Sequence, residues 1–122
     1  IMGSTPRWLL ARTLRGWCAQ PEAMSEARLR TIWDQFDQGT QRAVLRLHRS
    51  AELAAAGARL DTLTMPALIE WGEHDPWFAV EHAEAYAHRL PNAELVRIPD
   101  AGHWPWLERH EAADRIVEFV LA

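Results

Sequence analysis

The feature that most constrains the fold is a strand, helix, strand pattern in the second half of this 122-residue chain. Residues 67–71 are mostly apolar with little alternation, which is typical of a strand covered on both faces. Residues 94–98 predict a second short strand, and the stretch 79–90 between them predicts an amphipathic helix. Two strands joined through a helix are expected to be parallel, with a right-handed crossover. The sequence therefore predicts an α/β fold.

Each predicted strand runs directly into residues that can carry chemistry. Residues 72–76 read GEHDP and residues 99–103 read PDAGH. Open α/β sheets place ligands outside the carboxyl ends of their strands, so we expect Asp75 and His103 to lie within side-chain reach at one sheet edge. A carboxylate beside an imidazole accepts the Nδ1 proton, fixes the tautomer and stabilises the imidazolium that forms when Nε2 takes a proton. Gly72 and Gly102 are expected to let the backbone turn sharply as it leaves each strand.

The first half of the chain, residues 1 to about 57, is predicted to be helical throughout. Its apolar residues recur at helical spacing, and Gly57 is expected to end the last helix. The predicted helices there are residues 5–17, 25–36, 40–51 and an Ala-rich stretch at 53–60. Their expected N-caps, in chain order, are Ser4 or Thr5 (with Pro6 at the first helical position), Ser25 and Thr40. Residues 108–122 predict a further helix that closes the chain.

Composition and charge exclude several classes of partner. The net charge is −4 and there is no basic patch, so we expect no nucleic-acid partner. Cys18 is the single cysteine, which rules out an internal disulfide and a cysteine-rich metal site. Residues 110–114 read HEAAD, which lacks the second histidine of a zinc-protease helix, so no metal or cofactor is expected. No apolar run approaches the length of a membrane span.

The two strand ends resemble the acid and histidine segments of the α/β-hydrolase fold superfamily. The resemblance is carried by residues 72–76 and 101–103, and the flanking motifs LPNA (90–93) and WLER (106–109) fit it. It implies that Asp75 is the acid and His103 the base of a catalytic triad. It further implies that residues 58–122 are the C-terminal part of the hydrolase core, holding its last two strands. Residues 1–57 would then be a helical cap region and the helix that returns from it.

The sequence departs from the family pattern at the nucleophile. In this superfamily the nucleophile precedes the acid and the histidine along the chain. No G-x-S-x-G precedes Asp75, and Ser4 and Ser50 lack flanking glycines and follow no strand pattern. The simplest interpretation is a C-terminal fragment of a longer hydrolase, inactive by itself, whose nucleophile and oxyanion loop lie elsewhere. The opening residues, IMGSTP, read as neither a signal peptide nor a start, so we expect a missing true N-terminus and a cytoplasmic location.

Tryptophans cluster around the two strand ends. Trp77 and Trp104 are candidates for lining an apolar substrate pocket, although wide aromatic side chains also fill cores. The favoured function is an esterase-type hydrolase that acts on a small apolar ester, lactone or related acyl compound through a Ser nucleophile.

Two alternatives stay open at this point. An Asp nucleophile would make the protein a dehalogenase or an epoxide hydrolase, in which His103 activates a water. Epoxide hydrolases of this type resemble one another in using cap tyrosines, whereas the single tyrosine here, Tyr86, lies outside the cap. The other alternative is a non-catalytic ligand-binding member of the fold or a truncated gene product.

Overall fold

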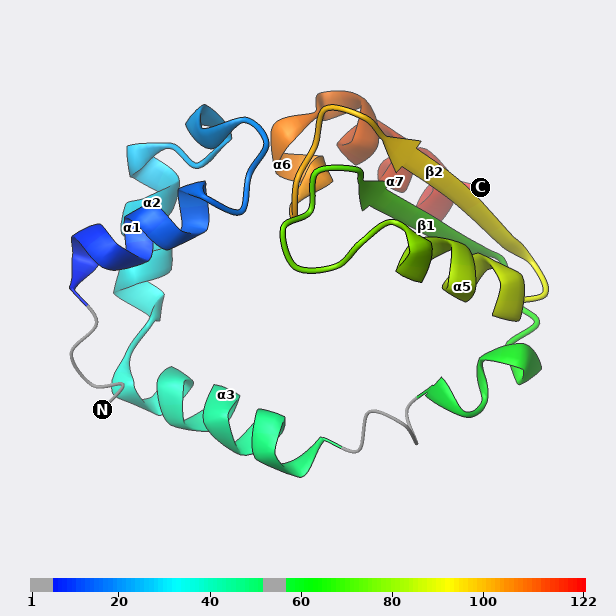
Figure 1. The fold of residues 1–122 in the computed structure, drawn as a ribbon, viewed down its shortest axis with the longest axis horizontal. Helices are drawn as coiled ribbons and strands as arrows, with labels where there is room; N and C mark the ends of the chain where they lie inside the picture. Colours follow the sequence, from blue (N-terminus) through cyan, green and yellow to red (C-terminus); the bar gives the residue numbers. More distant parts are fainter. Residues whose placement is uncertain (1–5, 52–56) are drawn as a thin grey trace.

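The computed structural model describes residues 6–51 and 57–122, and the strands in these ranges form one two-stranded sheet (Figure 1). Strands β1 (Ala67–Gly72) and β2 (Ala93–Ile98) are parallel and pair in register along their full lengths. Helix α5 (Glu81–Arg89) connects them. The parallel strand, helix, strand unit predicted from the sequence is confirmed.

Helices cover both faces of this sheet. Glu70 on β1 meets Arg115 of helix α7 (His110–Leu121), with Nη1 3.0 Å from Oε1. The neighbouring residue Trp71 faces the other side, where its ring centroid lies 6.5 Å from that of Tyr86 on α5. Side chains of successive strand residues point to opposite faces, so α5 and α7 lie on opposite sides of β1.

The closing helix predicted over residues 108–122 is confirmed as α7, and a short helix that was not predicted precedes it. A short helix α6 (Pro105–Glu108) ends where Arg109 adopts an extended conformation, and α7 then begins at His110. The Arg109 N–H donates to Pro105 O at 2.8 Å, which closes α6, while Arg109 O accepts from Ala112 and opens α7. Pro105 at the first position starts α6, a helix-start signal that the sequence prediction did not use.

The helical half of the chain contains α1 (Arg7–Arg15), α2 (Glu26–Gln35) and α3 (Gln38–Ser50). A short 3₁₀ turn, Pro21–Ala23, lies between α1 and α2, and another, Leu60–Thr62, precedes β1. The Ala-rich helix predicted over 53–60 falls mostly outside the described residues.

The predicted helix caps are correct in one case and wrong in another. Ser25 caps α2, its Oγ accepting the Arg28 N–H at 3.3 Å. Thr40 does not cap α3. Asp37 caps α3 instead, because its Oδ1 accepts the Thr40 N–H at 2.6 Å. The helix therefore begins at Gln38, three residues before the start that a Thr40 cap would give. Pro6, which has no side-chain acceptor, precedes α1, whereas the expected caps Ser4 and Thr5 lie outside the described residues.

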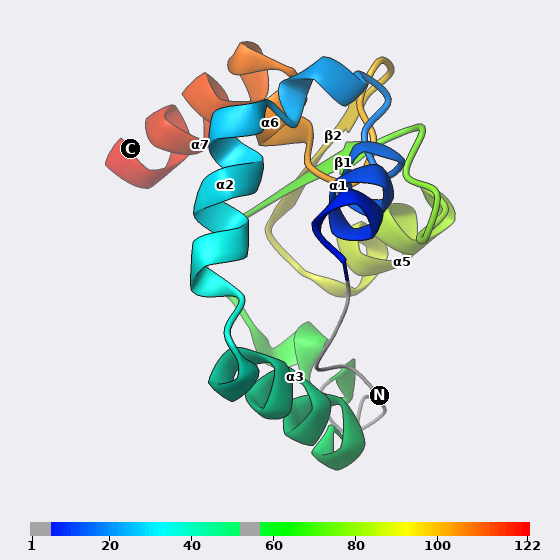
Figure 2. The same ribbon diagram turned by 90° about the vertical axis from the view of Figure 1, so that its left-hand side faces the viewer.

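Two small cores hold the molecule together. One lies between α1 and α2 and consists of Leu14, Cys18, Met24 and Leu29. Trp104 and Leu107, from the chain that follows β2, pack against it. This contact brings α1 and α2 to the carboxyl end of the sheet, whereas α3 lies apart from the strands (Figures 1 and 2). The second core joins β2 to α7 through Ile98, Ala101 and Ala112.

In the described parts of the chain no helix is both long and apolar enough to cross a bilayer.

Candidate active site

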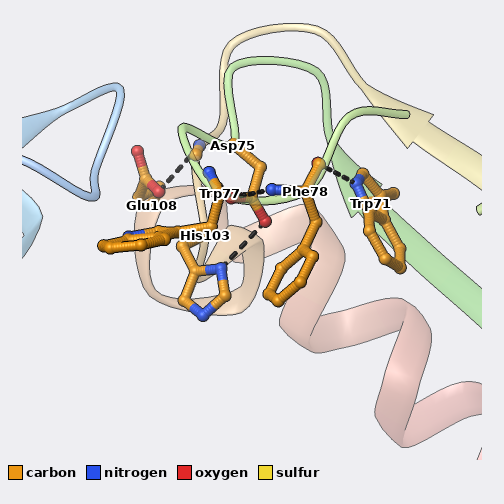
Figure 3. Close-up of polar contacts among 7 residues, drawn as sticks. Trp71, Asp75, Trp77, Phe78, His103 and Glu108 are labelled. Atoms are coloured by element: carbon orange, nitrogen blue, oxygen red, sulfur yellow. Dashed lines mark hydrogen bonds and ion pairs between the residues drawn. The ribbon is translucent and has the colours of Figure 1, made fainter. Parts of the chain in front are cut away.

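Asp75 and His103 meet at the carboxyl end of the sheet (Figure 3). Nδ1 of His103 lies 2.8 Å from Oδ2 of Asp75, which confirms the expected proximity of the two residues. An ionised carboxylate can only accept a hydrogen bond, so Nδ1 carries the proton in this contact. The Asp75 side chain is 7% exposed and the His103 side chain 29% exposed. The second ring nitrogen points away from the carboxylate and is the one available for chemistry (Figure 3).

The carboxylate of Asp75 is held by its own loop. Its Oδ1 accepts the backbone N–H groups of Trp77 at 2.8 Å and Phe78 at 3.1 Å. The Trp71 indole in turn donates to Phe78 O at 3.0 Å, which ties this loop back to β1. One carboxylate oxygen is therefore used to build the loop, and the other is free to orient the imidazole.

Gly72 and Gly102 are needed for close approach between chain segments. A Cβ built on Gly72 would lie 2.1 Å from Gly102 O, and one built on Gly102 would lie 2.4 Å from Trp17 O. No glycine among the described residues has a positive φ, so the left-handed conformation is not their reason for being here. The glycines let the two loops and residue 17 stack backbone against backbone. The chain also turns directly after Gly72, where the Asp75 N–H donates to Gly72 O at 3.3 Å, as expected from the sequence.

Two aromatic neighbours of His103 were not among the residues predicted for the site. The Phe78 ring stacks beside the imidazole, with centroids 6.0 Å apart and planes at 29°. Trp17, at the end of the α1 region, lies 5.8 Å from it edge-on, and Trp17 O accepts the His103 N–H at 2.8 Å. Phe78 could have been found from its place three residues after Asp75. Trp17 had no such signal, because 86 residues separate it from the histidine.

Of the predicted substrate-binding residues, Trp104 lies beside the imidazole and Trp77 lies beside Trp17. Trp104 is 5.3 Å from His103 between ring centroids and packs into the α1–α2 core, whereas Trp77 is 59% exposed and meets Trp17 edge-on. Neither lines the cavity of about 170 Å³ that adjoins the pair. The aromatic residues that line it are Trp71, Phe78 and Trp106. The substrate-binding role of Trp77 and Trp104 stays a prediction.

Cys18 is buried beside the site but is a poor nucleophile. Burial, followed by the negative charge of Glu108, raises the pKa of the thiol to about 11, so it is protonated at neutral pH. Its Sγ lies 3.6 Å from Leu14 O, within the α1–α2 core. Among residues 6–51 and 57–122, no three His, Cys, Asp or Glu side chains gather in a way that could hold a metal ion.

The chain combines a parallel strand pair flanked by helices with a carboxylate and an imidazole that meet at the carboxyl end of the strands. A family model described as alpha/beta hydrolase fold matches residues 6–109. The chain belongs to the α/β-hydrolase fold family.

Two curated relatives are named as hydrolases. The chain is 32% identical over 120 residues to a pimeloyl-[acyl-carrier protein] methyl ester esterase of Aromatoleum aromaticum, an alignment that covers 91% of this chain and 47% of that protein. It is 34% identical over 61 residues to 2-hydroxy-6-oxononadienedioate/2-hydroxy-6-oxononatrienedioate hydrolase 1 of Dechloromonas aromatica, covering 50% of this chain and 21% of that one.

Solved structures support the fold. A 2-hydroxy-6-oxo-6-phenylhexa-2,4-dienoate hydrolase from a Rhodococcus strain superposes with a TM-score of 0.67 at 19% identity, covering 96% of this chain and 45% of that one. A thermophilic esterase from Thermogutta terrifontis gives a TM-score of 0.58 at 24% identity, covering 92% and 42%. The chain spans less than half the length of each relative named here.

Proposed function

We propose that this chain is the C-terminal part of an α/β-fold hydrolase, in which Asp75 and His103 are the acid and the base of a nucleophile–His–Asp triad. The observation that carries the proposal is the 2.8 Å contact between His103 Nδ1 and Asp75 Oδ2 at the carboxyl end of two parallel strands. It is the arrangement by which a buried carboxylate orients a catalytic imidazole.

In this mechanism His103 moves a proton through Nε2. The imidazole takes the hydroxyl proton of a Ser nucleophile as that oxygen attacks the substrate carbonyl, and it later gives the proton to the leaving group. Asp75 stays ionised and stabilises the imidazolium that forms in between. Its Oδ1, bonded to two backbone N–H groups, keeps Oδ2 directed at Nδ1 throughout.

The nucleophile is proposed to come from outside these 122 residues. No nucleophile motif precedes Asp75, and the chain corresponds to less than half of each hydrolase that it resembles. In this assignment residues 1–57 are the helical cap region with its return helix, and residues 58–122 are the C-terminal part of the core. The 122-residue chain alone is then expected to be inactive.

The proposed substrate is a small, mainly apolar ester or related acyl compound. The imidazole is surrounded by aromatic rings, which suits an apolar acyl or alcohol group, and we assign Trp77 and Trp104 to the apolar wall of the substrate pocket. The Aromatoleum aromaticum relative is named as a methyl ester esterase, which supports ester hydrolysis.

The test compares the 122-residue chain with the intact polypeptide, which is expressed from the gene after its upstream part has been sequenced. Both are assayed on a short-chain activated ester as wild type, as His103→Ala and as Asp75→Asn. His110→Ala is the matched control, because His110 is exposed and lies on α7 outside the site. We expect His103→Ala and Asp75→Asn to lower kcat of the intact polypeptide by on the order of 10⁴-fold, with the control unchanged. Full turnover by intact His103→Ala, or His103-dependent turnover by the 122-residue chain, would contradict the proposal.

A further inference from the structure

Glu108 is a buried carboxylate that bridges two distant parts of the chain. It lies at the end of α6 and is 9% exposed. Its Oε1 accepts the Gly102 N–H at 2.9 Å, and its Oε2 accepts the Gln20 N–H at 2.8 Å. Within the described residues no Arg or His forms an ion pair with Glu108, so these two peptide groups are the groups that compensate its buried charge. Hydrogen bonds to an ionised acceptor are about twice as strong as neutral ones.

The bridge joins the histidine loop to residues 17–20, which follow α1. Three further contacts bind the same two segments together. The His103 N–H donates to Trp17 O at 2.8 Å, Gln20 Nε2 donates to Asp100 O at 3.1 Å, and Gly102 lies against the backbone of residues 17–19. The two consecutive N–H groups of Gly102 and His103 are therefore both held by groups from outside their own loop.

We propose that Glu108 is a positioning residue, which holds the His103 backbone against residues 17–20 so that the imidazole keeps its hydrogen bond to Asp75. Gly102 has no side chain with which to pack, so the placement of this loop depends on its backbone hydrogen bonds. Removing the carboxylate leaves the buried Gly102 N–H and the partly buried Gln20 N–H without this acceptor, and the loop must shift for water to reach Gly102. The contact between Nδ1 and Oδ2 weakens steeply as distance and angle depart from ideal, so a small backbone shift is sufficient to loosen it.

The catalytic importance of this role rests on the proposed function. The positioning of the imidazole itself can be measured without an activity assay. Nuclear magnetic resonance of the labelled 122-residue chain reports the exchange with water of the Gly102 and Gln20 amide protons and of the His103 Nδ1 proton. Glu108→Ala removes both acceptor oxygens, whereas Glu108→Gln keeps the size of the side chain and one acceptor. Glu111→Gln is the matched control, since Glu111 is an exposed carboxylate three residues further on.

In Glu108→Ala we expect the two amides to exchange roughly tenfold faster or more, the effect of losing one charge-assisted hydrogen bond. We expect the His103 Nδ1 proton to exchange faster as well, because the shifted loop loosens its bond to Asp75. Glu108→Gln should have a smaller effect of the same kind, and Glu111→Gln should leave all three protons as in the wild type. Circular dichroism verifies that each variant is folded, and Glu108→Gln carries the test where Glu108→Ala does not fold.

Unchanged exchange of all three protons in Glu108→Ala would overturn the proposal. Faster amide exchange with an unchanged Nδ1 proton would overturn it as well, because Glu108 would then support the loop without positioning the imidazole. Either result leaves the ester assay of His103→Ala unaffected, so failure of this inference is distinguishable from failure of the proposed triad.

Discussion

The sharpest structural prediction concerns Gly72, where β1 ends against the histidine loop. A Cβ at this position would lie 2.1 Å from Gly102 O and 2.4 Å from Ala101 O, both of them backbone atoms. Reaching ordinary van der Waals contact at 3.4 Å requires the loop to move by 3.4 − 2.1 = 1.3 Å. No positive-φ glycine is found in the described residues, so the cost of Gly72→Ala is one of steric overlap and not of backbone conformation.

A displacement of this size breaks contacts that hold the site. The Glu73 N–H donates to Ile98 O and the His74 N–H to Ala101 O, each at 3.0 Å, and neither survives a shift of more than an ångström. Overpacking in a tight interior costs about 1–3 kcal/mol. Because the overlapping atoms are backbone and cannot change rotamer, we expect Gly72→Ala to lower the free energy of unfolding by an amount at the upper end, about 3 kcal/mol.

Urea unfolding of the 122-residue chain, followed by tryptophan fluorescence, measures this cost. The matched control is Gly57→Ala, where the nearest atom to a new Cβ is a flexible Arg89 Nη1 at 3.6 Å, and where we expect no loss of stability. The His103 Nδ1 proton resonance should broaden in Gly72→Ala and stay sharp in the control. A Gly72→Ala chain within about 0.5 kcal/mol of the wild type, the range of an unremarkable surface substitution, would refute the steric argument.

Two further predictions concern buried charge. Arg115→Ala removes the cation that pairs with Glu70, whose side chain is 5% exposed. Among the described residues, Oε2 of Glu70 already has no hydrogen-bond partner. Breaking a buried ion pair costs about 3–5 kcal/mol. Because the Arg115 side chain is itself 37% exposed, we expect Arg115→Ala to lower the free energy of unfolding in urea by the lower end of this range, about 3 kcal/mol. A double variant, Glu70→Leu with Arg115→Met, should recover most of the lost stability. The pKa of Cys18 is raised by burial from 9.0 to about 11, so the folded state resists losing that proton, and stability should be complete below pH 9 and decline as pH rises toward 11. Cys18→Ala should remove this decline in thermal melts, and an equal slope in both proteins would contradict the assignment.

The strand positions and the paired site followed from local patterns in the sequence. Residues 67–71 and 94–98 are apolar segments of strand length, and a helix of sufficient length between them favours parallel pairing. Parallel strands end at the same edge, so a carboxylate after one and a histidine after the other had to approach each other. The cap of α2 at Ser25 was predictable as well, because the N–H group that it accepts belongs to a residue only three positions away.

Local signals misled where two of them competed. Asp37 and Thr40 are both good N-cap residues, and the sequence does not say which one accepts the first hydrogen bond. The apolar periodicity of residues 108–122 correctly predicted α7, but it did not reveal the short helix α6, which Pro105 starts just upstream. These choices depend on how the flanking chain enters and leaves each helix, which is set by packing.

The environment of the histidine was decided by contacts between residues far apart in the chain. Glu108 reads in sequence as an ordinary acidic residue, and its role as an acceptor for Gly102 and Gln20 exists only because α1 and its following segment dock on the histidine loop. Trp17 reaches His103 for the same reason, and that docking also explains Gly102, whereas Gly72 lies against the histidine loop itself. Periodicity and motifs report interactions along a few residues of chain. Which distant backbones touch is determined by the burial of a shared core, and the sequence carries no local mark of it.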